Sequence, residues 1–173
     1  MAALALINAV KGHEFLWKTE LRQALLQFQP DSHRMELFLE HQGIRYINDS
    51  KATNPHAVAA ALDAFPEPGK IILLMGGLDK DMLFEEILPH IDPVKQIFLY
   101  GTCQDKIYQV LCNKVSCIPC SSFESAVNAA CSSANCGDIV MLSPATASMD
   151  LFKNYRERGD TFKSLVQQFV QKV

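Results

Sequence analysis

The stretch that decides the fold is Asn48-Asp49-Ser50-Lys51-Ala52-Thr53-Asn54-Pro55. It follows a short apolar run that predicts a strand, and it precedes the Ala-rich run 56–62, which predicts a helix. Thr53 or Asn54 can cap that helix, and Pro55 suits its first turn because proline lacks the N–H that would have no partner there. A carboxylate, a hydroxyl and an ammonium therefore lie beside a helix N-terminus, where α/β sheets commonly bind anions. On the loop alone, a capped and solvated turn without a ligand is the simpler interpretation.

Apolar runs alternate with helical patterns through the rest of the chain. The predicted strands are 35–40, 44–48, 70–77, 94–100, 115–118 and 138–142, and the predicted helices are 56–62, 83–91, 104–113, 123–133 and 160–173. The first two strands form a β-hairpin around Gln42-Gly43. This order predicts an α/β fold: a Rossmann-like, mostly parallel sheet with helices on both faces, preceded by the β-hairpin and an N-terminal helical lead-in.

The chain has 173 residues, 49% of them hydrophobic and 20% charged, which suffices for one domain with a real core. Residues 1–29 are helical by composition, and Pro30-Asp31-Ser32 breaks their pattern. We therefore expect a helical lead-in over residues 1–29 and an α/β domain over residues 30–173.

Charge and hydropathy exclude two classes of partner. The net charge is -3, and no basic run alternates with aromatic residues, so we expect no nucleic acid. No apolar segment approaches the length of a membrane span, and the N-terminus lacks the basic start of a signal peptide. We therefore expect no membrane partner and a cytoplasmic location.

The six cysteines are best interpreted as free thiols. Cys117 and Cys120 form one Cys-x-x-Cys, but no second pair completes a zinc site, and no His/Glu pair has metal-ligand spacing. We expect no metal site, and a redox role for Cys117 and Cys120 is a minor alternative.

Two further stretches follow predicted strands, and because the sheet is mostly parallel, we expect the loops after Ile47, Met75 and Leu142 to lie at the carboxyl edge of one sheet. Gly76-Gly77-Leu78-Asp79-Lys80 lets a backbone approach a ligand that Lys80 could reach, although a tight turn with a solvated lysine is the commoner case. The run 142–150 offers small residues and hydroxyls that suit an anion, or simply a helix cap. His33 and Arg34, before the first strand, form either another candidate or an ordinary salt bridge.

Three motifs occur in one order: Asn48-Asp49-Ser50-Lys51-Ala52-Thr53-Asn54, then Gly76-Gly77-x-Asp79-Lys80, then Leu142-Ser143-Pro144-Ala145-x-Ala147-Ser148-x-Asp150-x-Phe152-Lys153-Asn154, with Arg158-Gly159 downstream. Together they resemble the C-terminal domain of the Mur ligase family, from about His33 onward. The third motif is similar to that of the branch that adds D-glutamate to UDP-N-acetylmuramoyl-L-alanine. It is unlike the branches that add L-alanine, a diamino acid or a dipeptide, and unlike folylpolyglutamate synthase.

The resemblance implies a reaction and a set of roles. In the family, ATP phosphorylates a carboxylate and the incoming amine attacks the acyl phosphate to form an amide. The implied D-glutamate site consists of Thr53, Lys80, Ser148, Met149 and Tyr155, with Lys80 as the charge partner.

The resemblance also implies a nucleotide side. Arg34 and Asp49 would bind ATP or ADP, with Asp49 at the ribose, and Lys51 would have the catalytic role of offsetting charge on the tetrahedral intermediate. Tyr155 stands where phenylalanine is often found, and Thr146 stands where cysteine is usual, which we interpret as a small change in packing.

The family's phosphate loop, magnesium ligands and UDP-binding domain do not occur in this sequence. Residues 1–29 resemble the end of the central ATPase domain and its linker helix. We therefore expect ATP and Mg2+ to act in a full-length enzyme, UDP-N-acetylmuramoyl-L-alanine to bind the missing domains, and this chain alone to bind neither cofactor and to be inactive.

Two alternatives remain. A stand-alone Rossmann-like nucleotide-binding module without catalysis would bind one nucleotide tightly, although the glycine fingerprint of such modules is missing. A ligase of the same family with another amino-acid substrate would differ in the motif 143–154.

Overall fold

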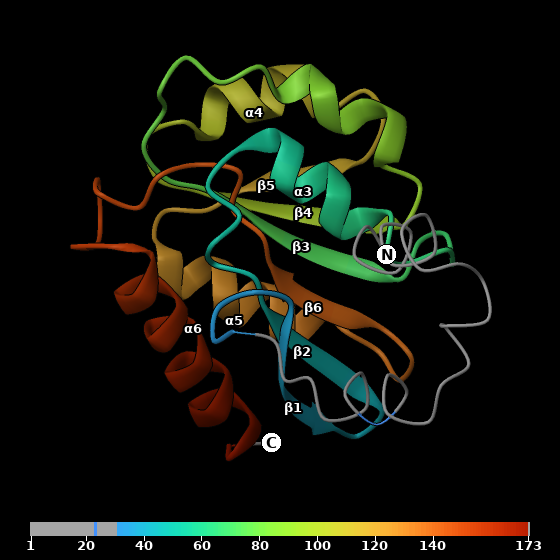
Figure 1. Ribbon diagram of the computed structural model, residues 1–173. Helices are drawn as coiled ribbons and strands as arrows, with labels where there is room; N and C mark the ends of the chain where they lie inside the picture. The colour runs from blue at the N-terminus through green and yellow to red at the C-terminus, as the bar shows by residue number, and fades with distance from the viewer. Residues whose placement is uncertain (1–22, 24–30, 173) are drawn as a thin grey trace. The chain divides into compact units, whose positions relative to one another are not determined.

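Six strands form a single sheet in the order β1-β2-β6-β3-β4-β5 in the computed structural model, which describes Gln23 and residues 31–172 (Figure 1). The chain divides into two units after Pro30, and the fold below is that of the second. The helical lead-in predicted for residues 1–29 lies outside the described residues, except for Gln23.

The strands are β1 (Glu36–His41), β2 (Ile44–Asn48), β3 (Ile71–Gly76), β4 (Val94–Tyr100), β5 (Ser116–Pro119) and β6 (Ile139–Leu142). The helices are α3 (Pro55–Leu62), the 3-10 helix η2 (Phe84–His90), α4 (Gln104–Leu111), α5 (Phe123–Ser133) and α6 (Tyr155–Val170). β1 and β2 pair antiparallel, and every other neighbouring pair is parallel. The predicted α/β fold with its leading hairpin is therefore confirmed.

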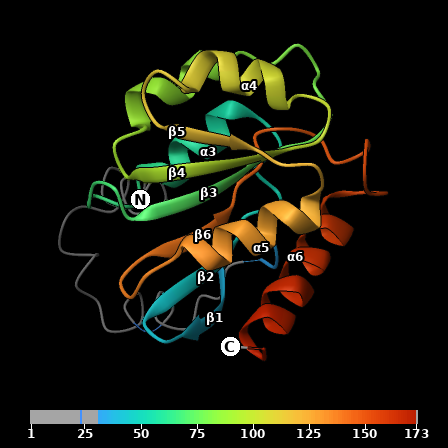
Figure 2. The ribbon, with the colours of Figure 1, turned by 180° about the vertical axis from the view of Figure 1, so that it is seen from behind.

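Helices cover both faces of the sheet (Figures 1 and 2). On one face, apolar residues of α3, η2 and α4 pack on alternate residues of β3 such as Leu73 and Met75. On the other face, α5 and α6 pack on the residues between them, Ile72 and Leu74. All six residues of β3 are buried because a strand covered on both faces has no solvent side, which explains its continuous apolar sequence.

Strand order gathers the predicted motifs. β6 lies between β2 and β3 and is parallel to both, so these three strands end at one edge of the sheet. The loops that follow them are 49–54, 77–83 and 143–154, and each carries one of the three sequence motifs. The structure therefore confirms that the motifs share the carboxyl edge of the parallel sheet, the usual ligand-binding edge of this fold class.

The helix boundaries agree with the sequence at α3 and differ at α6. The Asn54 side chain accepts a hydrogen bond from Ala57 N at 2.9 Å, so Asn54, one of the two predicted caps, begins α3. The prediction that the last helix begins at residue 160 is wrong, because Asn154 caps it and α6 begins at Tyr155. Asn154 was treated as part of a loop motif, although asparagine is a favoured cap.

The hairpin also departs from simple alternation. A register irregularity between Leu37 and Leu39 leaves Leu37 54% exposed. Such a bulge shifts the side-chain period by one residue. No helix of the described residues is both long and apolar enough to cross a bilayer.

Candidate functional site

Asp49 is the buried centre of the first loop. Its Oδ1 accepts a hydrogen bond from Met35 N at 3.1 Å, and its Oδ2 accepts one from Ser143 Oγ at 2.8 Å. Its backbone N–H donates to Leu142 O at 2.8 Å. Asp49 therefore joins the loop after β2, the loop after β6 and the residue before β1.

A pocket of about 310 Å³ opens beside this carboxylate. Arg34, Asp49 and Lys51 line it together with four alanines of the loop and α3 and with Met35. Burial raises the pKa of Asp49 to about 6, although the hydrogen bonds from Ser143 and Met35 oppose this shift. The structure thus brings Arg34, Asp49 and Lys51 to one concave site that contains two cations and one carboxyl with a raised pKa.

The raised pKa of Asp49 predicts a pH-dependent stability. The folded state binds this proton more tightly than the unfolded chain, whose carboxyl has a pKa of 3.8, so the contribution of Asp49 to stability falls as pH rises through 6. Asparagine does not titrate. The free energy of unfolding of Asp49→Asn minus that of the native chain should therefore increase by about 2 kcal/mol between pH 4.5 and pH 7.5.

Urea denaturation of both proteins at several pH values measures this difference. The exposed loop carboxylate Glu67 provides the control, and Glu67→Gln should follow the native chain at every pH. A constant difference between Asp49→Asn and the native chain across the pH range would contradict a raised pKa.

Backbone contacts join the second and third loops. Gly76 N donates to Pro144 O at 3.0 Å, and Leu78 N donates to Ala147 O at 2.9 Å. The buried Thr146 hydroxyl donates to Gly76 O at 2.7 Å. Thr146 is therefore more than a change in packing, because its hydroxyl ties the two loops together.

Tyr155 begins α6 beside the first loop. The Lys51 ammonium lies 5.6 Å from the centroid of the Tyr155 ring, and the Arg156 guanidinium lies 5.5 Å from it. The Tyr155 carbonyl accepts a hydrogen bond from Ser50 Oγ at 2.7 Å. Two cations thus lie near one ring, which favours an anionic group near this end of the site.

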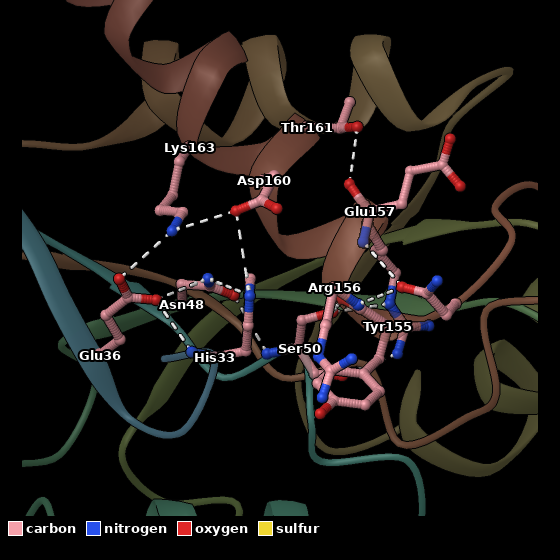
Figure 3. Close-up of polar contacts among 12 residues, drawn as sticks. His33, Glu36, Asn48, Ser50, Tyr155, Arg156, Glu157, Asp160, Thr161 and Lys163 are labelled. Carbon is pink, nitrogen blue, oxygen red and sulfur yellow. Dashed lines mark hydrogen bonds and ion pairs between the residues drawn. The ribbon is translucent and has the colours of Figure 1, made fainter. Parts of the chain in front are cut away.

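A polar cluster fixes the residues behind Lys51, and Figure 3 shows its members meeting between β1, β2 and α6. Asn48 Nδ2 lies 3.0 Å from His33 Nδ1 and donates to Glu36 Oε2 at 2.9 Å. The His33 carbonyl accepts the Lys51 N–H at 3.0 Å, and Lys163 Nζ lies 3.3 Å from Glu36 Oε1. The backbone of Lys51 is therefore held by a network that extends to α6.

His33 is neutral in this network. Its Nδ1 accepts from the Asn48 amide, which assigns the ring proton to Nε2. Burial lowers the pKa of His33, while Asp160, whose Oδ1 is 3.9 Å from His33 Nε2, opposes this shift. A neutral His33 does not form a salt bridge; its carbonyl instead accepts the Lys51 N–H, and its Nδ1 accepts the Asn48 amide.

Arg158 is fully buried beneath the same loops. Its Nη2 donates to Ser50 O at 2.9 Å and to Thr146 O at 3.1 Å, and its Nε donates to Ser50 Oγ at 3.0 Å. Its Nη1 has no hydrogen-bond partner, and no carboxylate of the described residues forms an ion pair with it. One guanidinium therefore binds two of the loops to α6.

The residues predicted to bind D-glutamate are spread over these elements. Ser148 is 2% exposed, whereas Met149 is 55% exposed, and Lys80 is also exposed. Thr53 is half-buried. The structure brings their loops together but leaves the role of each residue a prediction.

Sequence reasoning identified Arg158-Gly159 as part of a motif but did not predict what it does. Gly159 lets α6 approach the sheet, because a Cβ there would lie 2.9 Å from Asn48 Oδ1 and would overlap His33 Nδ1. Gly159 lies just outside the predicted helix 160–173, so the signal of a glycine inside a helix became visible only once α6 was seen to begin at Tyr155.

Metal ligands are not clustered in the described part of the chain, where no group of three or more His, Cys, Asp or Glu side chains is placed to hold an ion. All six cysteines are free, in agreement with the sequence prediction. The positive charges at the sheet edge include Arg34, Lys51 and Lys80, which suit anions such as phosphate and carboxylate.

The fold and this edge define a class of protein: a doubly wound α/β domain with three motif-bearing loops at the carboxyl ends of its parallel strands, where such domains commonly bind ligands. The chain belongs to the family described as "Mur ligase, glutamate ligase domain", which matches residues 33–146.

Similar proteins agree with this family. The chain is 40% identical over 167 residues to a UDP-N-acetylmuramoylalanine--D-glutamate ligase of Desulfitobacterium hafniense (strain Y51), covering 95% of this chain and 36% of that protein. It is 40% identical over 145 residues to the protein of the same name from Chlamydia felis (strain Fe/C-56), covering 83% of this chain and 34% of that protein. The chain thus spans about a third of the length of the curated relatives it matches.

Solved structures share the fold. The murein peptide ligase of Psychrobacter arcticus 273-4 superposes with a TM-score of 0.62 at 14% identity, over 87% of this chain and 32% of that one. The MurF ligase of Thermotoga maritima gives a TM-score of 0.60 at 14% identity, over 84% of this chain and 33% of that one.

Proposed function

We propose that this chain is the C-terminal, D-glutamate-binding domain of an ATP-dependent ligase that adds D-glutamate to UDP-N-acetylmuramoyl-L-alanine in peptidoglycan synthesis. The observation that carries the proposal is the meeting of three motif loops at one sheet edge, in a chain 40% identical to ligases of that name. Because the chain spans about a third of those relatives, we assign the ATPase phosphate loop, the magnesium ligands and the UDP-binding part to the remainder. Residues 1–29 are then the end of the central domain and its linker.

The two sides of the edge suit the two ligands. The pocket lined by Arg34, Asp49 and Lys51 fits a nucleotide, since a carboxyl can bind ribose hydroxyls and the cations can face phosphates. The MurF ligase of Thermotoga maritima, which shares the fold, was solved in complex with ADP. ATP bound here would supply the phosphoryl group, while Lys51 offsets negative charge on the reacting carboxylate and its intermediate.

The D-glutamate side needs partners for two carboxylates. Lys80 is exposed and unpaired in the described structure, whereas its neighbour Asp79 is bound by Lys106 at 2.9 Å. Thr53, Ser148, Met149 and Tyr155 would complete the site as donors and walls. Closure of the remaining domains over this edge would then exclude water from the acyl phosphate.

Lys80→Ala tests the assignment in the full-length enzyme. Loss of a charged hydrogen bond to a D-glutamate carboxylate should raise the KM for D-glutamate by about tenfold or more and change the KM for ATP by less than about threefold. Steady-state kinetics with each substrate varied measures both constants. Lys114→Ala, an exposed lysine after α4, is the matched control and should leave both unchanged. Equal changes in the two KM values, or no change in either, would contradict a role of Lys80 in binding D-glutamate.

Nucleotide binding by this chain alone distinguishes the proposed ligase domain from the alternative of a stand-alone nucleotide-binding module. The alternative requires tight binding of one nucleotide by this chain without other domains, whereas the ligase proposal requires that binding to be weak and ligation to be absent. Calorimetric titration of the 173-residue chain with ATP and ADP distinguishes the two.

A further inference from the structure

A second pocket lies at the ends of β4 and β5, bounded by the first turn of α5, the loop 150–152 and α6. Its volume is about 600 Å³, and its walls include Gly101, Ser121, Phe123, Asp150, Phe152 and Leu165. It shares no lining residue with the pocket formed by Arg34, Asp49 and Lys51. None of the residues predicted to bind D-glutamate or nucleotide lines it.

Two acceptor oxygens at this pocket have no partner. Asp150 Oδ2 accepts a hydrogen bond from Thr102 N at 3.2 Å, but Asp150 Oδ1 is buried and unpaired in the described structure. Gln104 Oε1 is buried and unpaired in the same way. Buried acceptors without donors are rare in folded proteins because they lose their water without replacement. Both side chains line the pocket, but the two oxygens are covered, so a ligand with N–H donors would reach them only after these side chains rotate toward the pocket.

The charge of the pocket is of one sign. Its lining residues include the carboxylates Asp150 and Glu124 and contain no Lys, Arg or His. These carboxylates oppose an anion, although the pocket also borders the N-termini of α4 and α5, whose dipoles act in the other direction. The Phe123 and Phe152 rings meet edge to face with centroids 5.1 Å apart, which adds an apolar wall. Aromatic walls beside a carboxylate suit an ammonium group attached to an apolar body.

We propose that this pocket is a binding site for an organic ammonium ion with an apolar body, held by Asp150 and packed against Phe123 and Phe152. The inference is independent of the proposed ligase reaction, since it uses other residues. It nevertheless has a link to that site, because Leu151 N and Phe152 N donate to Ser148 O at 3.2 and 2.8 Å. A ligand on Asp150 would therefore contact the loop that carries Ser148.

Three probes of similar size and different charge test the proposal on the 173-residue chain. They are 2-phenylethylammonium, the neutral 2-phenylethanol and the anion 3-phenylpropanoate. In NMR titrations, the ammonium should shift the amide resonances of Thr102, Phe123 and Leu151, and the shifts should saturate. The alcohol should bind at least about tenfold more weakly and the carboxylate not at all, as loss of a charged hydrogen bond predicts.

Variants assign the binding to Asp150. Asp150→Asn keeps an acceptor for Thr102 N. It should weaken binding of the ammonium by about tenfold and leave binding of the alcohol unchanged. Glu124→Gln at the exposed rim should have a smaller effect in the same direction, and it replaces the first variant if that one does not fold. Glu40→Gln on β1, which does not line the pocket, is the control. No ammonium binding at millimolar concentration, or equal binding of all three probes, would overturn the proposal.

Discussion

Gly76→Ala is expected to destabilise this protein by at least about 4 kcal/mol, a large fraction of the stability of about 5–15 kcal/mol that is typical of a domain. Gly76 has a φ of +139°, a conformation that alanine cannot adopt without strain. A Cβ there would lie 2.8 Å from the carbonyl carbon of Tyr100 and would overlap its oxygen. The chain cannot move away, because Gly76 N and Gly76 O are bound by Pro144 O and Thr146 Oγ1.

Gly69→Ala is the matched control for backbone strain. Gly69 has a φ of +64°, but a Cβ there would meet nothing within 4 Å. Gly69→Ala should lower the free energy of unfolding by only about 1 kcal/mol, which is the cost of the left-handed conformation for alanine. Urea denaturation followed by circular dichroism measures both variants. Equal destabilisation of the two would show that conformation rather than the contact with Tyr100 sets the cost at Gly76.

Arg158→Met is expected to cost about 3 kcal/mol of stability and to loosen the loops of the site. Methionine retains the length and apolar stem but removes the donors to Ser50 O and Thr146 O. Each buried carbonyl left without a donor costs about 1–3 kcal/mol. Removal of an unpaired buried charge offsets part of this loss, because that charge is expensive to desolvate.

Arg156→Met is the control for Arg158, since Arg156 is exposed on the same helix two residues earlier. It should change the free energy of unfolding by less than about 0.5 kcal/mol. Hydrogen exchange adds a local measurement: amides of the loops 49–54 and 143–150 should exchange faster in Arg158→Met only. A stability of Arg158→Met within about 0.5 kcal/mol of the native chain would mean that desolvation cancels the hydrogen bonds.

The two pockets differ in charge as they do in position. Arg34 and Lys51 line the first, whereas the second has carboxylates alone among its charged lining residues. The loop 143–152 lines the second pocket through residues 150–152, whereas it reaches the first only through the hydrogen bond from Ser143 to Asp49. Anion binding at the first pocket and cation binding at the second therefore test different residues.

Long elements could be predicted because their signals are local. Periodicity and turn residues located every strand and helix from 35 to 142, and Asn54 could be identified as one of two possible caps. The start of α6 was missed because Asn154 lay inside a stretch interpreted by motif. The exposure of Leu37 was missed because a bulge has no reliable sequence signal.

The candidate site, like the fold, has features that the sequence predicted and features that it did not. Residue types and motif order, together with the family resemblance, identified Arg34, Asp49, Lys51 and Lys80 as candidates and placed their loops at one sheet edge. Sequence could not predict that the carboxyl of Asp49 is buried with a raised pKa, that Thr146 joins two loops, or that Arg158 has no charged partner. These properties depend on which side chains cover one another in the folded chain and so remove one another from water.

By itself, the sequence determined the alternation of strands and helices, and with it an α/β fold whose motif loops follow parallel strands. Apolar period and capping chemistry act over a few residues, so the local chain contains that information. Only the tertiary structure decided that β6 lies between β2 and β3, that α6 buries Arg158 against Ser50 and Thr146, and that Asp150 is left with an unpaired oxygen. Desolvation and hydrogen-bond partnership join residues about a hundred positions apart, as Ser50 and Arg158 are, and such pairs exist only once the sheet has formed.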